Sequence, residues 1–192
     1  MRRHGVSRYP ALSLVVALSA LAAAGAAAQT AGAHVHGVST LLVAVEAGDL
    51  ILELTTPGDD VVGFEHRPAD AAQTRRAESA LALMKSPERL FRFDAAAGCE
   101  PGVVAVLRSL LPSGHGDGER SHATGSGHRD ETEHAEFRLR YSYRCRAVDG
   151  LKTLELLLFD HFPGMRRVRV QIVGPQGQTS HRLDRGSRKA AF

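Results

Sequence analysis

Residues 38–55 read VSTLLVAVEAGDLILELT, and this stretch decides which kind of fold the chain can adopt. Apolar and polar side chains alternate on both sides of the short connection AGD at residues 47–49. The apolar residues that share one side of the pleat are Leu41, Val43, Val45, Leu50, Leu52 and Leu54. Alternation with period two is typical of a half-buried strand, and glycine in a short connection favours a turn. The stretch therefore predicts a β-hairpin formed by residues 38–46 and 50–55.

Further strands and one helix are predicted along the rest of the chain. The expected strands are 90–94, 103–111, 136–145, 151–159, 167–173 and 178–183, with 103–111 taken as buried and a helix left open for 151–159. Residues 70–85 are rich in alanine and have helical spacing, whereas 185–192 is expected to be a tail. We therefore expect an α+β domain: a sandwich-like, mostly antiparallel arrangement of six to eight strands with one main α-helix.

The first 28 residues have the features of a secretory signal peptide. Arg2, Arg3 and Arg8 precede an apolar run at residues 12–24, and three alanines at 26–28 offer a cleavage site. The run is shorter than the roughly 20 residues that span a membrane. We therefore expect an exported protein with a signal peptide at 1–28, a single domain at 29–192 and no stable membrane insertion after cleavage; an uncleaved anchor is the alternative.

Charge argues against nucleic acid as a partner. Removing the three signal-peptide arginines from the 24 basic residues leaves 21, which equals the 21 acidic residues. A neutral chain lacks the basic surface that nucleic acids or anionic membranes attract.

Two histidines, His34 and His36, flank Val35 just before the hairpin. Residues at i and i+2 of an extended chain point to the same side, which suits metal chelation. The hairpin returns the chain to this end, and about ten further residues are ample to bring His66 close. Neutral imidazoles bind Zn²⁺ and Cu²⁺, so a three-histidine site is possible. The alternative is a frayed N-terminus beside a hydrogen-bonded loop histidine.

A second group of histidines lies in the low-complexity segment 112–134. Its members are His115, His122, His128 and His134. They lie among acidic residues, with almost nothing apolar nearby, so the segment is expected to be disordered and to bind zinc weakly, or else to be a solvated linker. His161 is a candidate fourth ligand or a plain loop residue.

Two cysteines, Cys99 and Cys145, fit a disulfide in an exported protein, the alternative being two buried thiols. Antiparallel pairing of 103–111 with 136–145 would place both cysteines at the end of that hairpin opposite segment 112–134. The bond would then clamp the base of the hairpin.

Enzyme signatures are absent from the sequence. It contains no nucleophile elbow, phosphate-binding glycine loop or zinc-protease helix. We therefore expect a protein that is not an enzyme. Two other classes stay open: a metal-independent envelope interaction module, and a copper-zinc superoxide dismutase-like enzyme, whose remaining ligands have no match here.

Taken together, these motifs resemble the ZrgA-like family of zinc-regulated periplasmic proteins. The matching features are HVHG at 34–37, VGFEH at 62–66, the cysteine pair around the histidine-bearing segment, and LF at 158–159 with FPG at 162–164. The resemblance implies a periplasmic protein that binds zinc and assists its uptake beside an ABC importer. The chain departs from the family in segment 112–134, where its four histidines are scattered rather than densely repeated.

Cleavage near Ala28 is the first testable prediction. The charged start, short apolar run and alanine site predict that the periplasmic protein lacks residues 1–28. Mass spectrometry of the periplasmic protein measures this directly. A mature species that retains the residues from Met1 to Ala24 would refute the prediction.

Overall fold

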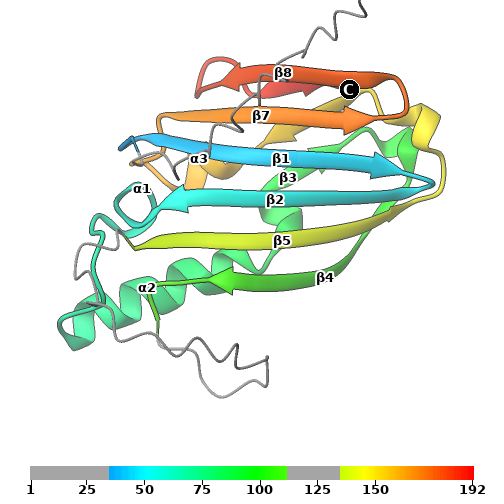
Figure 1. The fold of residues 1–192 in the computed structure, drawn as a ribbon. Helices are drawn as coiled ribbons and strands as arrows, with labels where there is room; N and C mark the ends of the chain where they lie inside the picture. Colours follow the sequence, from blue (N-terminus) through cyan, green and yellow to red (C-terminus); the bar gives the residue numbers. More distant parts are fainter. Residues whose placement is uncertain (1–34, 112–134) are drawn as a thin grey trace, which may run out of the picture. The chain divides into compact units, whose positions relative to one another are not determined.

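A six-stranded mixed sheet forms one layer of the protein (Figure 1). The computed structural model describes residues 35–111 and 135–192. In spatial order, the strands of this sheet are β4 (Cys99–Arg108), β5 (Glu136–Cys145), β2 (Asp49–Pro57), β1 (Val38–Glu46), β7 (Arg167–Gly174) and β8 (Gly177–Leu183).

The predicted first hairpin is confirmed at the centre of this sheet. β1 and β2 pair antiparallel, with Leu41 opposite Leu54 and Val45 opposite Leu50. Ala47 and Gly48 both have positive φ angles, of 48° and 91°, as a tight hairpin turn requires. The alternating apolar side chains of both strands are buried in the core.

Strand β7 makes the sheet mixed, which the sequence pattern did not predict. It lies parallel to β1, with Val38 opposite Arg167 and Ala44 opposite Val173. Parallel neighbours need a long connection, and here that connection contains most of the chain. The centre of the sheet therefore joins residues from both ends of the domain.

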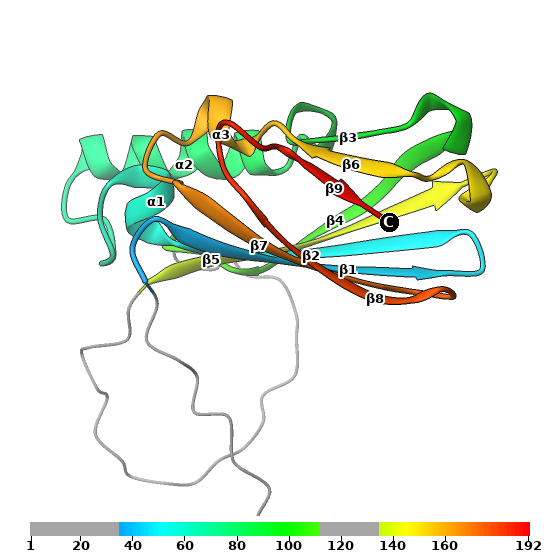
Figure 2. The same cartoon turned by 90° about the horizontal axis from the view of Figure 1, so that it is seen from above.

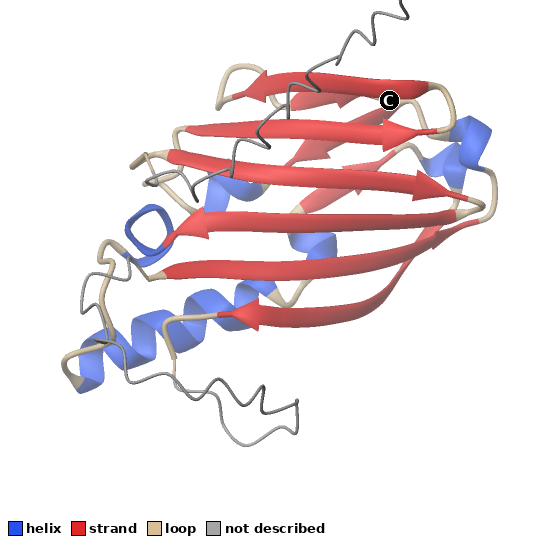
Figure 3. Ribbon diagram, in the orientation of Figure 1, coloured by secondary structure: helices blue, strands red, loops and turns tan. Residues whose placement is uncertain are grey.

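A second layer covers one side of the large sheet (Figure 2). It contains a three-stranded sheet in the order β3 (Phe91–Phe93), β6 (Thr153–Leu156) and β9 (Lys189–Ala191). The helices are α1 (Gly58–Val62), α2 (Ala71–Met84) and α3 (Leu158–His161), with 3₁₀ turns at Pro87–Arg89, Ala95–Ala97 and Val148–Gly150 (Figure 3). The predicted fold class, an α+β domain with sandwich-like packing and one main helix, is confirmed.

Helix α2 begins where its capping residue predicts. The Asp70 side chain accepts a hydrogen bond from the Gln73 backbone N–H at 2.8 Å, a typical N-cap. Ala77 and Met84 face the core and are fully buried. None of the helices in the part of the chain that the structure describes has the length and apolarity to cross a membrane.

Aromatic contacts join the two layers. The Phe91 ring meets Tyr141 edge-on at 5.0 Å, and Phe93 meets Tyr143 in the same way at 4.9 Å. Such edge-to-face pairs add to the free energy of burial. Burial raises the pKa of both tyrosines well above the usual value for a phenol, so they stay neutral in the core.

Three expectations about strands were wrong. Residues 103–111 are not a buried strand: β4 is the edge of the large sheet, and Val103 is 72% exposed. Residues 185–192 are not a tail, because β9 pairs with β6 and buries Ala190. The described residues also contain nine strands rather than six to eight. Residues 151–159, left open between strand and helix, divide into β6 and the start of α3.

The Cys99–Cys145 disulfide is present and occupies the predicted place. The two residues are direct cross-strand partners at the end of the β4–β5 pair. They are 46 positions apart in the sequence. Segment 112–134, which lies outside the described residues, connects the opposite ends of the same two strands. The bond therefore closes the hairpin at its base.

Replacing Cys99 and Cys145 together by Ser should destabilise the protein. Loop-closure entropy for a loop of this length predicts a loss of up to about 4 kcal/mol in the free energy of unfolding, measured by urea titration. Titration of the denatured, unreduced wild type should find no free thiol. Two titratable thiols would contradict the prediction.

Candidate functional site

His36 lies at the tight turn from which β1 starts. Gly37 follows it with a φ of 81°, and the Val38 backbone N–H closes the turn onto the Val35 carbonyl at 2.9 Å. A Cβ on Gly37 would overlap the guanidinium of Arg166. That guanidinium donates a hydrogen bond to the His36 carbonyl oxygen at 2.8 Å. The backbone of His36 is thus held by the start of β7.

Helix α1 brings acidic residues to the same turn. It follows β2 directly and carries Asp59 and Asp60 in its first turn. Gly58 sits against the carbonyl oxygens of Phe64 and Ala135, so closely that a side chain would not fit. Gly63 ends the helix in the left-handed region, at a φ of 82°. The chain then reverses direction, which places Glu65 beside His36.

The imidazole of His36 lies between two carboxylates. Its Nδ1 is 3.1 Å from Asp59 Oδ2, and its Nε2 is 3.4 Å from Glu65 Oε2. The His36 side chain is 57% exposed, whereas Glu65 is only 12% exposed. Solvent and small ions can therefore reach the ring, while the Glu65 side chain beside it is largely buried.

Asp60 is the buried support of this arrangement, at 1% exposure. Its carboxylate accepts a hydrogen bond from the Gly37 backbone N–H. Its second oxygen lies 3.3 Å from the Ser39 hydroxyl, which is also 2.8 Å from the Thr56 hydroxyl. Burial raises the pKa of Asp60, and the negative charge of Asp59 acts in the same direction, while the two hydrogen bonds oppose them. Asp60 thus connects α1 to the first residues of β1.

His66 has other partners in the structure. Its Nδ1 is 2.8 Å from the Arg67 carbonyl oxygen, and its ring stacks on Phe64 at 5.0 Å. This hydrogen bond occupies Nδ1 and leaves Nε2 as the nitrogen that a metal could use. Within residues 35–111 and 135–192, no three His, Cys, Asp or Glu side chains form a metal cage.

His161 is held at the end of α3. Its Nε2 is 3.1 Å from the Arg89 carbonyl oxygen. Arg188 binds both carboxylate oxygens of the neighbouring Asp160 at 2.7 Å, so this carboxylate already has a partner. The remaining predicted ligands, His34, His115, His122, His128 and His134, lie outside the described residues.

Sequence reasoning missed three residues that shape the site: Asp59, Asp60 and Arg166. The motif PGDD at 57–60 follows the first hairpin, where its proline and glycine are typical of a turn. Proline and glycine followed by two acidic residues is also a helix-start pattern, because carboxylates favour the positive end of a helix. That signal could have placed Asp59 and Asp60 beside the histidines. No local signal could have placed Arg166.

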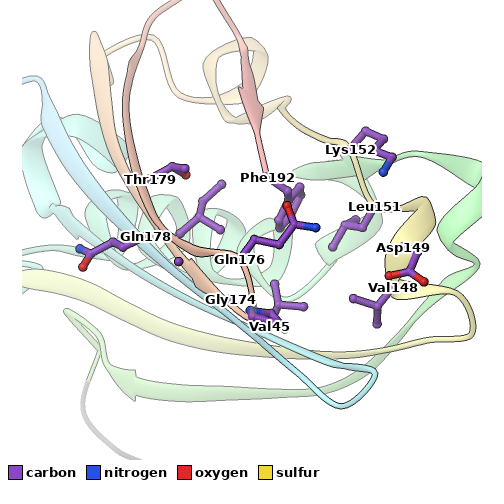
Figure 4. Close-up of a pocket in the computed structure, with 13 residues that line it drawn as sticks. Val45, Val148, Asp149, Leu151, Lys152, Gly174, Gln176, Gln178, Thr179 and Phe192 are labelled. Carbon is purple, nitrogen blue, oxygen red and sulfur yellow. The ribbon is translucent and has the colours of Figure 1, made fainter.

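A cavity of about 250 Å³ lies at the other end of the sheet (Figure 4). Its floor includes Val45 at the end of β1, together with Leu151 and Phe192 from the second layer. Asp149 and Lys152 are the charged residues among those that line it. None of the described residues that line the cavity is a histidine or cysteine, and His36 is not among them, so the cavity is separate from the His36 site.

These features define an α+β domain of two packed sheets with a carboxylate-flanked histidine at one end of the larger sheet. The chain belongs to the ZrgA family: the model described as "ZrgA family zinc uptake protein" matches residues 33–192. No curated protein matches the chain. The resemblance of the sequence to the ZrgA family is thus confirmed. The description of this family indicates a role in zinc uptake.

Asp60→Ala should destabilise the domain by about 2 kcal/mol, because it leaves the buried Gly37 amide without its acceptor and removes one of the two partners of the Ser39 hydroxyl. Asp60→Asn is the matched control, since its amide can accept from Gly37 and donate to Ser39. Urea unfolding of the two variants measures the difference. Equal stability of Asp60→Ala and wild type would show that the carboxylate does not support the turn.

Proposed function

We propose that this protein binds Zn²⁺ at His36 and Glu65 and assists zinc uptake or buffering. The observation that carries the proposal is the position of the His36 imidazole between two carboxylates, in a member of a zinc uptake family. The metal is cargo in this proposal, so the site needs to bind it and also to release it.

The distance between two candidate ligand atoms suits zinc. Zinc binds histidine nitrogen and carboxylate oxygen at about 2.0–2.2 Å in tetrahedral geometry, which separates two ligand atoms by roughly 3.4 Å. Nε2 of His36 and Oε2 of Glu65 are 3.4 Å apart. Both atoms can therefore bind one ion with little rearrangement.

Asp59 supplies the usual partner of a zinc-bound histidine. A ligating imidazole donates its second N–H to a carboxylate or carbonyl, which fixes the ring and raises its basicity. Asp59 Oδ2 lies 3.1 Å from Nδ1 of His36, the nitrogen opposite the proposed ligand. Asp59 thus orients the ring, while Glu65 shares the metal.

His34 and His66 are proposed to complete the shell. His34 is two residues from His36, and His66 follows Glu65 with its Nε2 not used by the Arg67 hydrogen bond. A fourth position would then be open to water, His161 or a histidine of segment 112–134. An open position of this kind allows exchange, which a closed structural site does not.

The cellular setting belongs to the same proposal. Export by the signal peptide at 1–28 would place the domain at 29–192 in the periplasm, where the disulfide is stable. The histidines of segment 112–134 would add weak, accessory zinc binding. A component of a zinc ABC importer is the proposed recipient, and the protein itself is proposed not to be an enzyme.

His36→Ala and Glu65→Gln should each weaken zinc binding at least tenfold, since each removes a ligand. Asp59→Asn should weaken it less, because only the orientation of the ring is affected. Isothermal titration calorimetry with zinc near neutral pH measures these affinities. Protons compete with zinc for imidazole nitrogen, so wild-type affinity should also fall as the pH is lowered.

His181→Ala is the matched control. The His181 ring is hydrogen-bonded to the Ala191 carbonyl oxygen on β9, and His181 is not one of the proposed ligands. The zinc affinity of this variant should equal that of wild type. If His36→Ala and Glu65→Gln also bind like wild type, with unchanged circular dichroism, the proposed site is wrong.

A further inference from the structure

The outer side of the six-stranded sheet carries many charged side chains, and arginine is the most frequent of them. The second layer, with α2, α3 and the three-stranded sheet, packs against the other side (Figure 2). No described helix or strand covers the outer side. It is therefore a broad solvent-facing surface, which we call the open face.

One row of residues on the open face is rich in arginine. Following the strand register across the sheet from β8 to β4, the row is Arg182, Arg169, Thr40, Thr55, Arg138 and Arg108. Strands lie about 4.8 Å apart, so this row is about 24 Å long. It contains four cations and no carboxylate.

The arginines are paired with each other across neighbouring strands. Arg169 lies opposite Arg182, and Arg108 lies opposite Arg138. Like charges directly opposite each other destabilise a sheet. The Glu53 carboxylate offsets this for Arg138, which donates a hydrogen bond to it at 2.7 Å. Within the described residues, no hydrogen bond or ion pair neutralises Arg169 or Arg182.

Charge is distributed unevenly along the strands. The arginine row crosses β1 near its start, four residues after His36, whereas Glu46 and Asp49 lie at the far hairpin end. Arg144 pairs with Asp49 there at 2.9 Å. Glu53 and Glu136 pair with the arginines on β5 and β4, so the open face is cationic chiefly at the β7–β8 end of the row and close to neutral at the hairpin end.

An apolar patch adjoins the row. It consists of Leu42, Ala44, Ile51 and Val173, which are neighbours in the strand register. Leu42 is 44% exposed and Val173 is 51% exposed. Exposed apolar side chains rimmed by charge are typical of protein interaction surfaces.

We propose that the open face docks an acidic, extended segment of a partner protein across its arginine row. Such a segment advances about 3.3 Å per residue, so about seven residues would span the row. Carboxylates would neutralise the unpaired arginines, and apolar side chains would cover the patch. A polypeptide fits better than an anionic membrane, because the face is cationic at the β7–β8 end of the row and close to neutral at its hairpin end, so a uniformly negative surface would be attracted to only part of it.

The inference goes beyond the proposed zinc site and does not depend on it. The row and the site share strand β1, with Thr40 only four residues from His36. A docked acidic segment would therefore place carboxylates, which are themselves zinc ligands, next to the cargo.

The test uses fluorescein-labelled poly-L-glutamate and the purified protein, with binding followed by fluorescence anisotropy. Wild type should bind the probe, and the affinity should fall as salt is added. Arg169→Gln with Arg182→Gln should lower the affinity about tenfold, whereas Arg169→Lys with Arg182→Lys should keep most of it.

Arg75→Gln with Arg185→Gln is the control, because it removes the same charge from exposed positions outside the open face. This control should bind the probe like wild type. His36→Ala should also bind it like wild type, and this result would show that probe binding does not depend on the proposed zinc site. Absence of probe binding, or an equal loss in both double variants, would overturn the inference. Binding to phosphatidylglycerol vesicles instead of poly-L-glutamate, with the same arginine dependence, would also overturn it in favour of a membrane.

Discussion

The buried carboxylate of Asp60 is the contact on which the arrangement of the site depends. It joins α1, the helix that follows β2, to the turn that precedes β1, through the Gly37 amide and the Ser39 hydroxyl. A buried carboxylate is costly unless it is hydrogen-bonded, so the position of Asp60 constrains both segments at once. Asp59 then faces His36 as a consequence, since it is the adjacent residue of the same helical turn.

Much of the fold was predictable because its signals are local. Alternation over residues 38–55 predicts the hairpin, the alanine-rich helical spacing of residues 70–85 predicts α2, and the two cysteines at the ends of the predicted strand pair predict the disulfide hairpin. Each depends on residues that are near one another in the sequence or on a simple antiparallel register. The predicted return of the hairpin to the start of β1 is also correct, because the Thr56 hydroxyl meets that of Ser39 there.

The missed features depend on contacts between distant parts of the chain. Arg166 reaches His36 only because β7 lies parallel to β1, and periodicity does not reveal which strands are neighbours. Strand β9 contains a single buried alanine in a basic segment, so it has almost no pattern to recognise. Strand β4 has an apolar composition that suggests burial, yet its position at the edge exposes it. In the site, the hairpin return was foreseen, whereas the contact of Asp59 with His36 required the geometry of α1.

The two sides of the six-stranded sheet have different roles. Its inner side supplies the core, where Leu52, Leu139 and Val170 are fully buried against the second layer. Its outer side contributes little to that core and carries arginine and exposed apolar residues. Substitutions on the outer side can therefore change how the surface interacts with other molecules at small cost in stability.

The parallel pairing of β1 with β7 also sets the order in which the molecule can assemble. The guanidinium that anchors His36 lies 130 residues later in the chain. A chain emerging N-terminus first has the histidine early but lacks its anchor until nearly the whole domain is present. Contacts of such long sequence separation form late and slowly. A partly folded or truncated chain would lack the organised His36 site, so possession of that site distinguishes finished molecules from unfinished ones.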